Sequence, residues 1–316
     1  MKNSAFCLLT AAAVIVIFAV AMLTLANDYF FFAGYVVLQY IVLATAWNVL
    51  GGYTGYINFG TAGFFAIGAY SSVVLHKLWG PPIPLLIVVG GVLSGLVGLG
   101  MGVLTLRLRG VFFAIGTLAL AIVVQTFVTN WDFVGGSRGV YIIRPATAPL
   151  LGNYIHYLFL VMLALAGFAI ALARCVEHST LGFGLAAVRD DEQAAEAAGV
   201  PTLKLKLIST TLSGALMGMA GAPLPYYVTY LDPTSGFNLA YAVNSIAMPL
   251  IGGMTSWVGP LLGAIFLGTI QQAATVTISS SLNLLLVGVL LVLFVVVAPN
   301  GLIGLWRPRR RAREGS

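Results

Sequence analysis

Continuously apolar runs of roughly 20 residues recur along this chain, each long enough to cross about 30 Å of hydrocarbon as a helix. A membrane β-barrel would instead alternate polar and apolar residues. Only 8% of the residues are charged and 60% are hydrophobic, whereas a soluble domain carries about 25% charge. The runs therefore predict an all-α integral membrane protein, a polytopic helical bundle.

The runs and the glycine and proline breaks between them predict about ten transmembrane helices, within a range of 8–10. These predicted spans are residues 5–26, 30–50, 57–75, 83–105, 111–130, 154–173, 207–229, 240–252, 258–279 and 283–299. The third follows a glycine cluster and the eighth is short, so their bounds are the least defined. The first run exceeds the 7–15 apolar residues of a secretory signal core, so we expect an uncleaved span.

The basic residues indicate the orientation. If the N terminus lies inside and ten helices cross, only Lys77, Arg138 and Arg144 of the 15 Lys and Arg residues lie on outer segments. The positive-inside rule then places both termini and the segment 174–206 in the cytoplasm. The basic tail 306–316 is interpreted as a topology anchor, with binding of anionic lipid or a partner as the alternative.

Several activities are not expected. No carboxylate or histidine lies well inside a predicted span, which disfavours proton coupling through side chains. No G-x-x-x-x-G-K-[ST] motif and no nucleophile–base arrangement is present, so we expect no enzyme and no ATPase motif in this chain. Two cysteines imply neither a disulfide framework nor a metal site. We expect no cofactor bound by this chain and no nucleic-acid partner.

The segment 174–206 is the longest polar stretch and holds five of the nine acidic residues. Asp190 is predicted to N-cap a helix over 191–198, with Gln193 completing a capping box and Gly199 ending it. Two turns of helix are marginal in water, so this helix must pack against something. It either docks on a cytoplasmic partner or is a solvated, alanine-rich connector.

The string STLGFGLAAVRDDEQAAEAAGV at 179–200 resembles the cytoplasmic EAA loop of ABC-transporter permeases. It is similar in particular to the branched-chain amino acid permease family, on its LivM-like side. The residues in step with the family pattern are Ser179, Gly182, Ala187, Arg189, Asp191, Glu192, Ala194, Ala195, Glu196, Ala197 and Gly199. Phe183 stands at the usual arginine position and Gly184 at the usual alanine, so this protein is expected to differ from its relatives there.

Segments 47–70, 107–120, 134–140, 251–264 and 300–308 also resemble family motifs, in the family's order. The resemblance implies one transmembrane permease domain over 1–316, multi-pass in a bacterial inner membrane. It implies a homologous second permease subunit, two cytoplasmic ABC ATPase subunits that use ATP and Mg, and a periplasmic substrate-binding protein. The residues it assigns to the ATPase-coupling loop are Gly182, Arg189, Asp190, Asp191, Glu192, Ala195, Glu196 and Gly199.

Two glycine-rich blocks share the pattern G-G-x-T-x-aromatic-apolar, at 51–57 and 252–258, which hints at an internal repeat. A broken helix in either block would free backbone groups to face a solute path, and a kinked packing element is the alternative. The candidate pathway or hinge residues are Gly51, Gly52, Gly55, Asn58, Gly60, Gly252, Gly253 and Gly259. No residue is assigned to substrate binding.

The leading interpretation is therefore a permease subunit of an ATP-driven importer for branched-chain or related amino acids. A urea or short-amide importer permease has the same motifs and stays open. An ion-coupled secondary carrier acting alone is the alternative from another class, although the missing membrane carboxylates argue against it. A scaffold without transport activity is the third.

Overall fold

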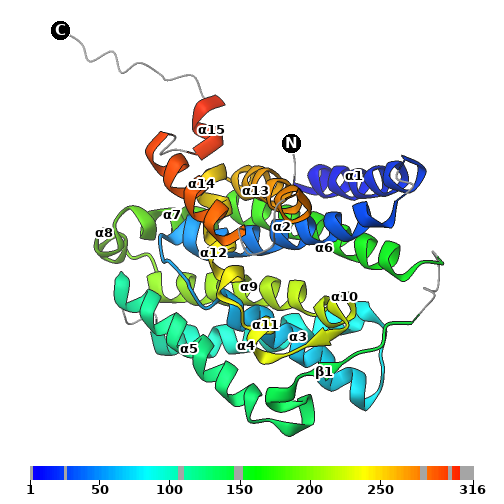
Figure 1. Ribbon diagram of the computed structural model, residues 1–316. Coiled ribbons are helices and arrows are strands. Elements are labelled where there is room, and N and C mark those ends of the chain that lie inside the picture. Colours follow the sequence, from blue (N-terminus) through cyan, green and yellow to red (C-terminus); the bar gives the residue numbers. More distant parts are fainter. Residues whose placement is uncertain are drawn as a thin grey trace.

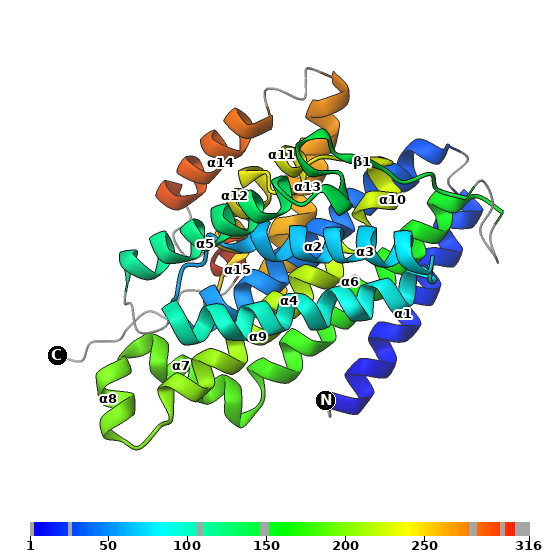
Figure 2. The ribbon, with the colours of Figure 1, turned by 90° about the horizontal axis from the view of Figure 1, so that it is seen from below.

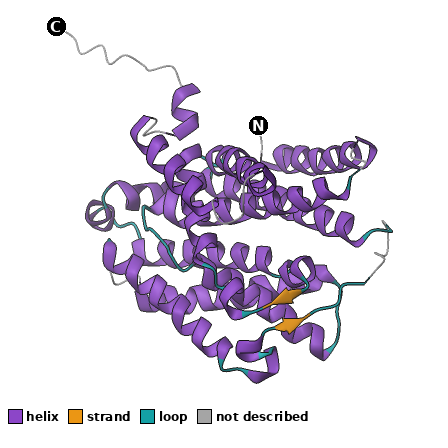
Figure 3. Ribbon diagram, viewed as in Figure 1, coloured by secondary structure: helices purple, strands orange, loops and turns teal. Residues whose placement is uncertain are grey.

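The computed structural model describes residues 3–24, 27–105, 110–145, 152–277, 283–297 and 301–306. Almost every described element is a helix, and a single two-stranded sheet is the exception within these ranges (Figures 1 and 3). The predicted all-α class is confirmed. Several basic residues lie outside the described residues, namely Lys2, Arg107, Arg109 and the basic tail after Trp306. The cytoplasmic placement of the termini therefore stays a prediction.

The longer helices are α1 (Asn3–Thr24), α2 (Asp28–Thr54), α3 (Thr61–Leu78), α4 (Ile83–Thr105), α5 (Val111–Thr129), α6 (Tyr154–Glu177), α9 (Thr202–Gly221), α12 (Leu239–Gly252), α13 (Val258–Thr277) and α14 (Asn283–Val297). The shorter elements are η1 (Asp132–Val134), η2 (Gly136–Arg138), β1 (Val140–Tyr141), α7 (Thr180–Asp190), α8 (Glu192–Ala197), α10 (Leu224–Val228), β2 (Tyr230–Leu231), α11 (Pro233–Gly236) and α15 (Gly301–Trp306).

Seven segments of the described chain are long and apolar enough to cross a membrane, fewer than the ten predicted. They are α1, α2, α4, α5, α6, α13 and the stretch of α9 and α10. Each remaining predicted span is a helix, but α12 has 14 residues and α14 has 15 described residues. The third predicted span begins too early, because residues 55–60 are irregular and α3 starts at Thr61. The chain is a multi-pass membrane protein.

Helix α2 lies at the centre of the bundle, with α6, α9, α12 and α13 packed around it (Figure 2). Every residue from Ile41 to Thr54 is buried, including the indole of Trp47. The C-terminal half of α2 therefore has no face left for lipid, which fits a position inside the protein.

Glycines let α4 pack closely on α9, because the small residues Gly95 and Gly98 allow the two backbones to approach. A Cβ added at Gly95 would lie 3.2 Å from the Cβ of Ala215, and one at Gly98 would lie 3.1 Å from the carbonyl oxygen of Thr210. The Ser94 hydroxyl donates to the carbonyl of Gly214 at 2.8 Å across the same contact. Of this pair, α9 is the helix that packs on α2.

The two ends of the bundle differ. Helices α7 and α8 lie at one end, while α10 and the antiparallel pair of β1 and β2 lie toward the other (Figures 1 and 2). In that pair Val140 lies opposite Leu231, and the Tyr230 hydroxyl donates to the carbonyl of Arg138 at 2.8 Å. The polar segment 174–206 thus occupies the end away from this sheet.

Candidate functional site

Helices α7 and α8 form an elbow between α6 and α9. The Asp191 carboxylate caps α8, because its Oδ1 accepts the N–H groups of Gln193 at 2.9 Å and Ala194 at 3.1 Å. The short helix is present, but its predicted cap at Asp190 is wrong. Helix α7 runs on through Asp190, so the cap shifts by one residue and Gln193 no longer occupies the capping-box position.

Two glycines shape the elbow. A Cβ at Gly182 would lie 2.3 Å from the carbonyl oxygen of Val176, so only glycine lets α7 fold back onto the end of α6. Gly199 has φ +84°, in the left-handed region, and ends α8 as predicted. The fold of the elbow therefore depends on two of the residues that the sequence assigned to the coupling loop.

The outward side of the elbow is acidic and small, with one aromatic ring. Gly182, Leu185 and Val188 face inward on α7, and Ala195 is buried on α8. We define the elbow surface as the outward residues Phe183, Asp190, Asp191, Ala194, Glu196, Ala197 and Ala198. Phe183 is 71% exposed, which is unusual for a phenyl ring on a polar segment. Within the described chain its carboxylates contact only neighbouring residues: Asp190 pairs with Arg189 at 3.3 Å, Asp191 caps α8, and Glu196 accepts from Thr202 at 2.7 Å. The surface stays exposed, and its charge suits a basic partner with an apolar recess.

A buried ion pair fastens the elbow to the bundle. The sequence placed Lys206 in the polar segment, but it lies within α9 and is only 3% exposed. Its Nζ donates to Oε1 of Glu192 at 2.7 Å and to the Tyr56 hydroxyl at 3.2 Å. That hydroxyl donates to Oε2 of Glu192 at 2.6 Å. The Lys206–Glu192–Tyr56 cluster joins α8, α9 and the loop after α2.

Two further side chains, one on the elbow and one at the end of α6, contact the glycine-rich blocks. The guanidinium of Arg189 donates to the carbonyl oxygen of Gly52 at 3.5 Å. At the end of α6, Oε2 of Glu177 accepts the backbone N–H of Trp257 at 2.6 Å and the Tyr53 hydroxyl at 3.3 Å. Arg189 thus links the elbow to the first block, and Glu177 links the adjoining end of α6 to both blocks.

The first block is a break between two helices. Helix α2 ends at Thr54, Gly55 takes φ +77°, and residues 55–60 are irregular. Asn58 holds this break, because its carbonyl oxygen accepts the indole N–H of Trp47 at 2.9 Å and its side chain accepts the N–H of Gly60 at 2.7 Å. The candidate hinge residues of this block all lie at the end of α2 or in the break that follows it: Gly51, Gly52, Gly55, Asn58 and Gly60.

The second block is a close contact between helices α12 and α13. A Cβ at Gly252 would lie 1.8 Å from the carbonyl oxygen of Gly259, and one at Gly259 would lie 1.7 Å from that of Gly253. A Cβ at Gly52 would lie 2.5 Å from the carbonyl oxygen of Met254, so the two blocks meet. The geometry of the second block favours the packing interpretation.

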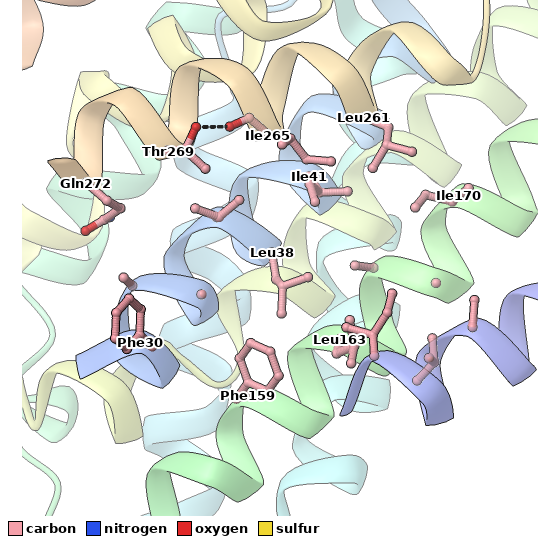
Figure 4. Close-up of a pocket in the computed structure, with 18 of the residues that line it drawn as sticks. Phe30, Leu38, Ile41, Phe159, Leu163, Ile170, Leu261, Ile265, Thr269 and Gln272 are labelled. Carbon is pink, nitrogen blue, oxygen red and sulfur yellow. Dashed lines mark hydrogen bonds between the residues drawn. The ribbon is translucent and has the colours of Figure 1, made fainter. Parts of the chain in front are cut away.

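Two cavities differ sharply in chemistry. A groove of about 900 Å³ between α1, α2, α6 and α13 is lined almost wholly by apolar side chains such as Leu38, Ile41 and Phe159 (Figure 4). It cannot compensate a charged ligand. A second cavity, of about 510 Å³, lies between residues 54–59, the start of α5 and the elbow, and its walls include Arg189 and Glu192.

Sequence reasoning missed the contacts of Tyr53, Tyr56, Glu177, Lys206 and Trp257. The two tyrosines looked like part of a glycine block, and Lys206 looked like an ordinary surface charge. The sequence does place Lys206 near the start of α9 and shortly after the acidic helix α8. Spacing along the sequence, however, does not show which residues pair across the fold. Within the described ranges no group of three or more His, Cys, Asp or Glu residues is placed to hold a metal ion.

The chain matches the family model described as "Branched-chain amino acid transport system / permease component" over residues 29–295. It is 28% identical over 302 residues to the high-affinity branched-chain amino acid transport system permease protein LivM of Escherichia coli K12, covering 88% of this chain and 70% of that protein. It is 25% identical over 275 residues to the probable branched-chain amino acid transport permease protein LivH of Methanocaldococcus jannaschii, covering 80% and 85%. A solved metal-chelate type ABC transporter in an inward-facing conformation aligns with TM-score 0.45 and 15% identity, over 94% of this chain and all of that one.

Proposed function

We propose that this chain, which belongs to the branched-chain amino acid transport permease family, is a permease subunit of an ATP-driven importer for branched-chain amino acids. The relatives LivM and LivH are described as permeases for these amino acids, which supports the substrate class. Urea or a short amide is the alternative cargo, because permeases for these solutes have the same motifs.

The observation that carries the coupling role is the elbow surface together with its attachment to the bundle. An exposed acidic surface at one end of the molecule connects through Glu192 and Arg189 to the first glycine-rich block. At the adjoining end of α6, Glu177 contacts both blocks. A partner that moves this surface would move the break at residues 55–60 as part of a rigid body. We therefore assign the energy input to the elbow.

The remaining subunits follow from this assignment. Two ATPase subunits, which bind ATP and Mg, dock on the elbow surface and on its counterpart in a homologous second permease. A periplasmic binding protein delivers the amino acid at the opposite end. The complex resides in a bacterial inner membrane with the elbow and both termini in the cytoplasm, and this chain supplies no catalytic residue.

Exchanging Glu196 for lysine should weaken the ATPase subunit's association and lower permease-stimulated ATP hydrolysis about tenfold, which corresponds to ~1.4 kcal/mol. The reversed charge would repel a basic docking groove. Glu196→Gln is the control, because an amide oxygen can still accept the hydrogen bond that Thr202 donates at 2.7 Å. Co-purification and hydrolysis are measured together. If co-purification and hydrolysis are equal for Glu196→Lys and wild type, α8 is not part of the docking surface.

Phe183→Ser should also weaken association with the ATPase subunit. An exposed phenyl ring stabilises a complex when the partner covers it. We expect a loss of about 1–3 kcal/mol in affinity for the ATPase subunit, with Phe183→Leu retaining most of it. Surface binding measurements on both variants give the comparison. If the Phe183→Ser protein binds the ATPase subunit as tightly as the Phe183→Leu protein does, the ring does not contact the ATPase.

Uptake into proteoliposomes tests the function as a whole. The chain is co-reconstituted with a candidate second permease, ATPase and binding protein, and leucine, urea and a short amide are compared as cargo. ATP-dependent leucine accumulation is expected. Preferential accumulation of urea would replace the substrate class while keeping the transport role.

A further inference from the structure

We propose that the cavity between residues 54–59, the start of α5 and the elbow binds the imported amino acid after release and thereby restrains ATP hydrolysis. This inference rests on the proposed function, since it assumes that the elbow receives the motion of an ATPase. It adds a ligand site and a feedback role to residues otherwise used for coupling.

The cavity has the size and position for such a ligand. Its volume of about 510 Å³ lies within the 300–1,000 Å³ range of small-molecule sites. Its walls come from three elements that are far apart in sequence. A molecule in this cavity therefore touches the broken segment, a membrane helix and the elbow together.

The charged part of the wall suits a carboxylate. Arg189 is held by long contacts, 3.3 Å to Asp190 and 3.5 Å to the carbonyl of Gly52, whereas charge-assisted bonds are usually about 2.7–2.9 Å. Its partner Asp190 is itself 73% exposed in its side chain, so this surface pair is weak. The guanidinium can exchange these contacts for a bidentate carboxylate at little cost.

The rest of the wall suits an ammonium group and a short branched side chain. Glu192 lines the cavity, and its carboxylate, which accepts from Lys206 and Tyr56, gives this part of the wall a negative charge. Ile57, Val111 and Ala114 supply apolar surface, and Ile57 and Val111 are 49% and 72% exposed. A zwitterion with a small apolar side chain suits both the charged and the apolar part of this wall. The groove of Figure 4 has no charged residue in its lining.

Bound ligand would bridge the elbow and the loop after α2. It stabilises the arrangement of these elements seen here, because that arrangement forms the cavity. A ligand shifts an equilibrium only toward the state that it binds better. Hydrolysis that requires the elbow to move away from residues 54–59 is then slowed as product accumulates.

The test uses the complete transporter in proteoliposomes whose ATPase subunits face outward, with binding protein and leucine inside. L-leucine added outside reaches only the elbow side, and we expect it to lower ATP hydrolysis. The analogues 4-methylpentanoate and 3-methylbutylamine each lack one charged group and should inhibit about tenfold less well. Equal inhibition by all three would overturn the zwitterion assignment.

Variants that fill the cavity locate the effect. Ala114→Leu and Val111→Phe should leave basal hydrolysis near the wild-type rate and weaken leucine inhibition about tenfold. Ile115→Phe is the control, because its neighbouring position on α5 does not line the cavity. Inhibition unchanged in both filling variants would overturn the site.

Two results separate this inference from the proposed function. ATP-driven uptake without any leucine inhibition overturns the feedback site and leaves the permease role standing. If no ATP-driven uptake is found, calorimetry with leucine and the purified chain still tests the site. Heat of binding that is lost in Ala114→Leu supports it, and no heat of binding in the wild type overturns it.

Discussion

Replacing Lys206 with methionine should destabilise the protein by about 3–5 kcal/mol and uncouple ATP hydrolysis from uptake. The substitution leaves the Glu192 carboxylate, only 14% exposed, without the cation that lies 2.7 Å away. The elbow would lose its ion pair with α9, and the neutral Tyr56 hydroxyl cannot replace the charge of the lysine. Thermal loss of the monodisperse fraction on size-exclusion chromatography measures stability, and the ratio of leucine taken up to ATP hydrolysed measures coupling.

The double variant Lys206→Met with Glu192→Leu separates the two effects. Removing both charges takes away the unpaired carboxylate, so most of the stability should return. Coupling should stay low, since the polar link between α8 and the loop after α2 is still missing. Recovery of both stability and coupling would show that the cluster is merely structural.

Gly259→Ala should prevent accumulation of folded protein. The new Cβ would lie 1.7 Å from the carbonyl oxygen of Gly253, and backbone cannot move aside as a flexible side chain can. The α12–α13 contact would have to open, and this overpacking should lower the free energy of unfolding by about 1–3 kcal/mol or more. Folded yield is measured by fluorescence-detected size-exclusion chromatography of a tagged chain.

The matched control is Gly100→Ala on α4. Both glycines are helical, but a Cβ at Gly100 meets no atom within 4 Å. Alanine there should be neutral or stabilising by up to about 1 kcal/mol through helix propensity. A Gly259→Ala yield equal to that of Gly100→Ala would contradict the close backbone contact.

Much of the helical architecture could be predicted from the sequence, because apolar runs and breaks depend on local composition. The bounds of α4 and the start of α13 match the predicted spans. The start of α3 does not, since Ile57 and Phe59 are apolar but lie in a break held by contacts to Trp47 and Thr117. Hydropathy does not distinguish an apolar loop buried in protein from the first turn of a helix.

The position of the candidate site could be predicted from the sequence, but the contacts between its side chains could not. Capping chemistry and the resemblance located the short helix, yet the cap moved from Asp190 to Asp191 because α7 is longer than expected. The pairing of Lys206 with Glu192 spans 14 residues and includes a tyrosine 150 residues away from the lysine. Contacts of this kind depend on how helices assemble, which local spacing does not determine.

We propose that the elbow receives energy from a separate ATPase. Leucine uptake by the reconstituted four-component system, with wild type beside Glu196→Lys, tests it most directly. We expect uptake that requires ATP, the ATPase and the binding protein, and that persists when ion gradients are collapsed. Uptake should fall about tenfold in the variant. Uptake by this chain alone, driven by an ion gradient and unaffected by the substitution, would contradict it.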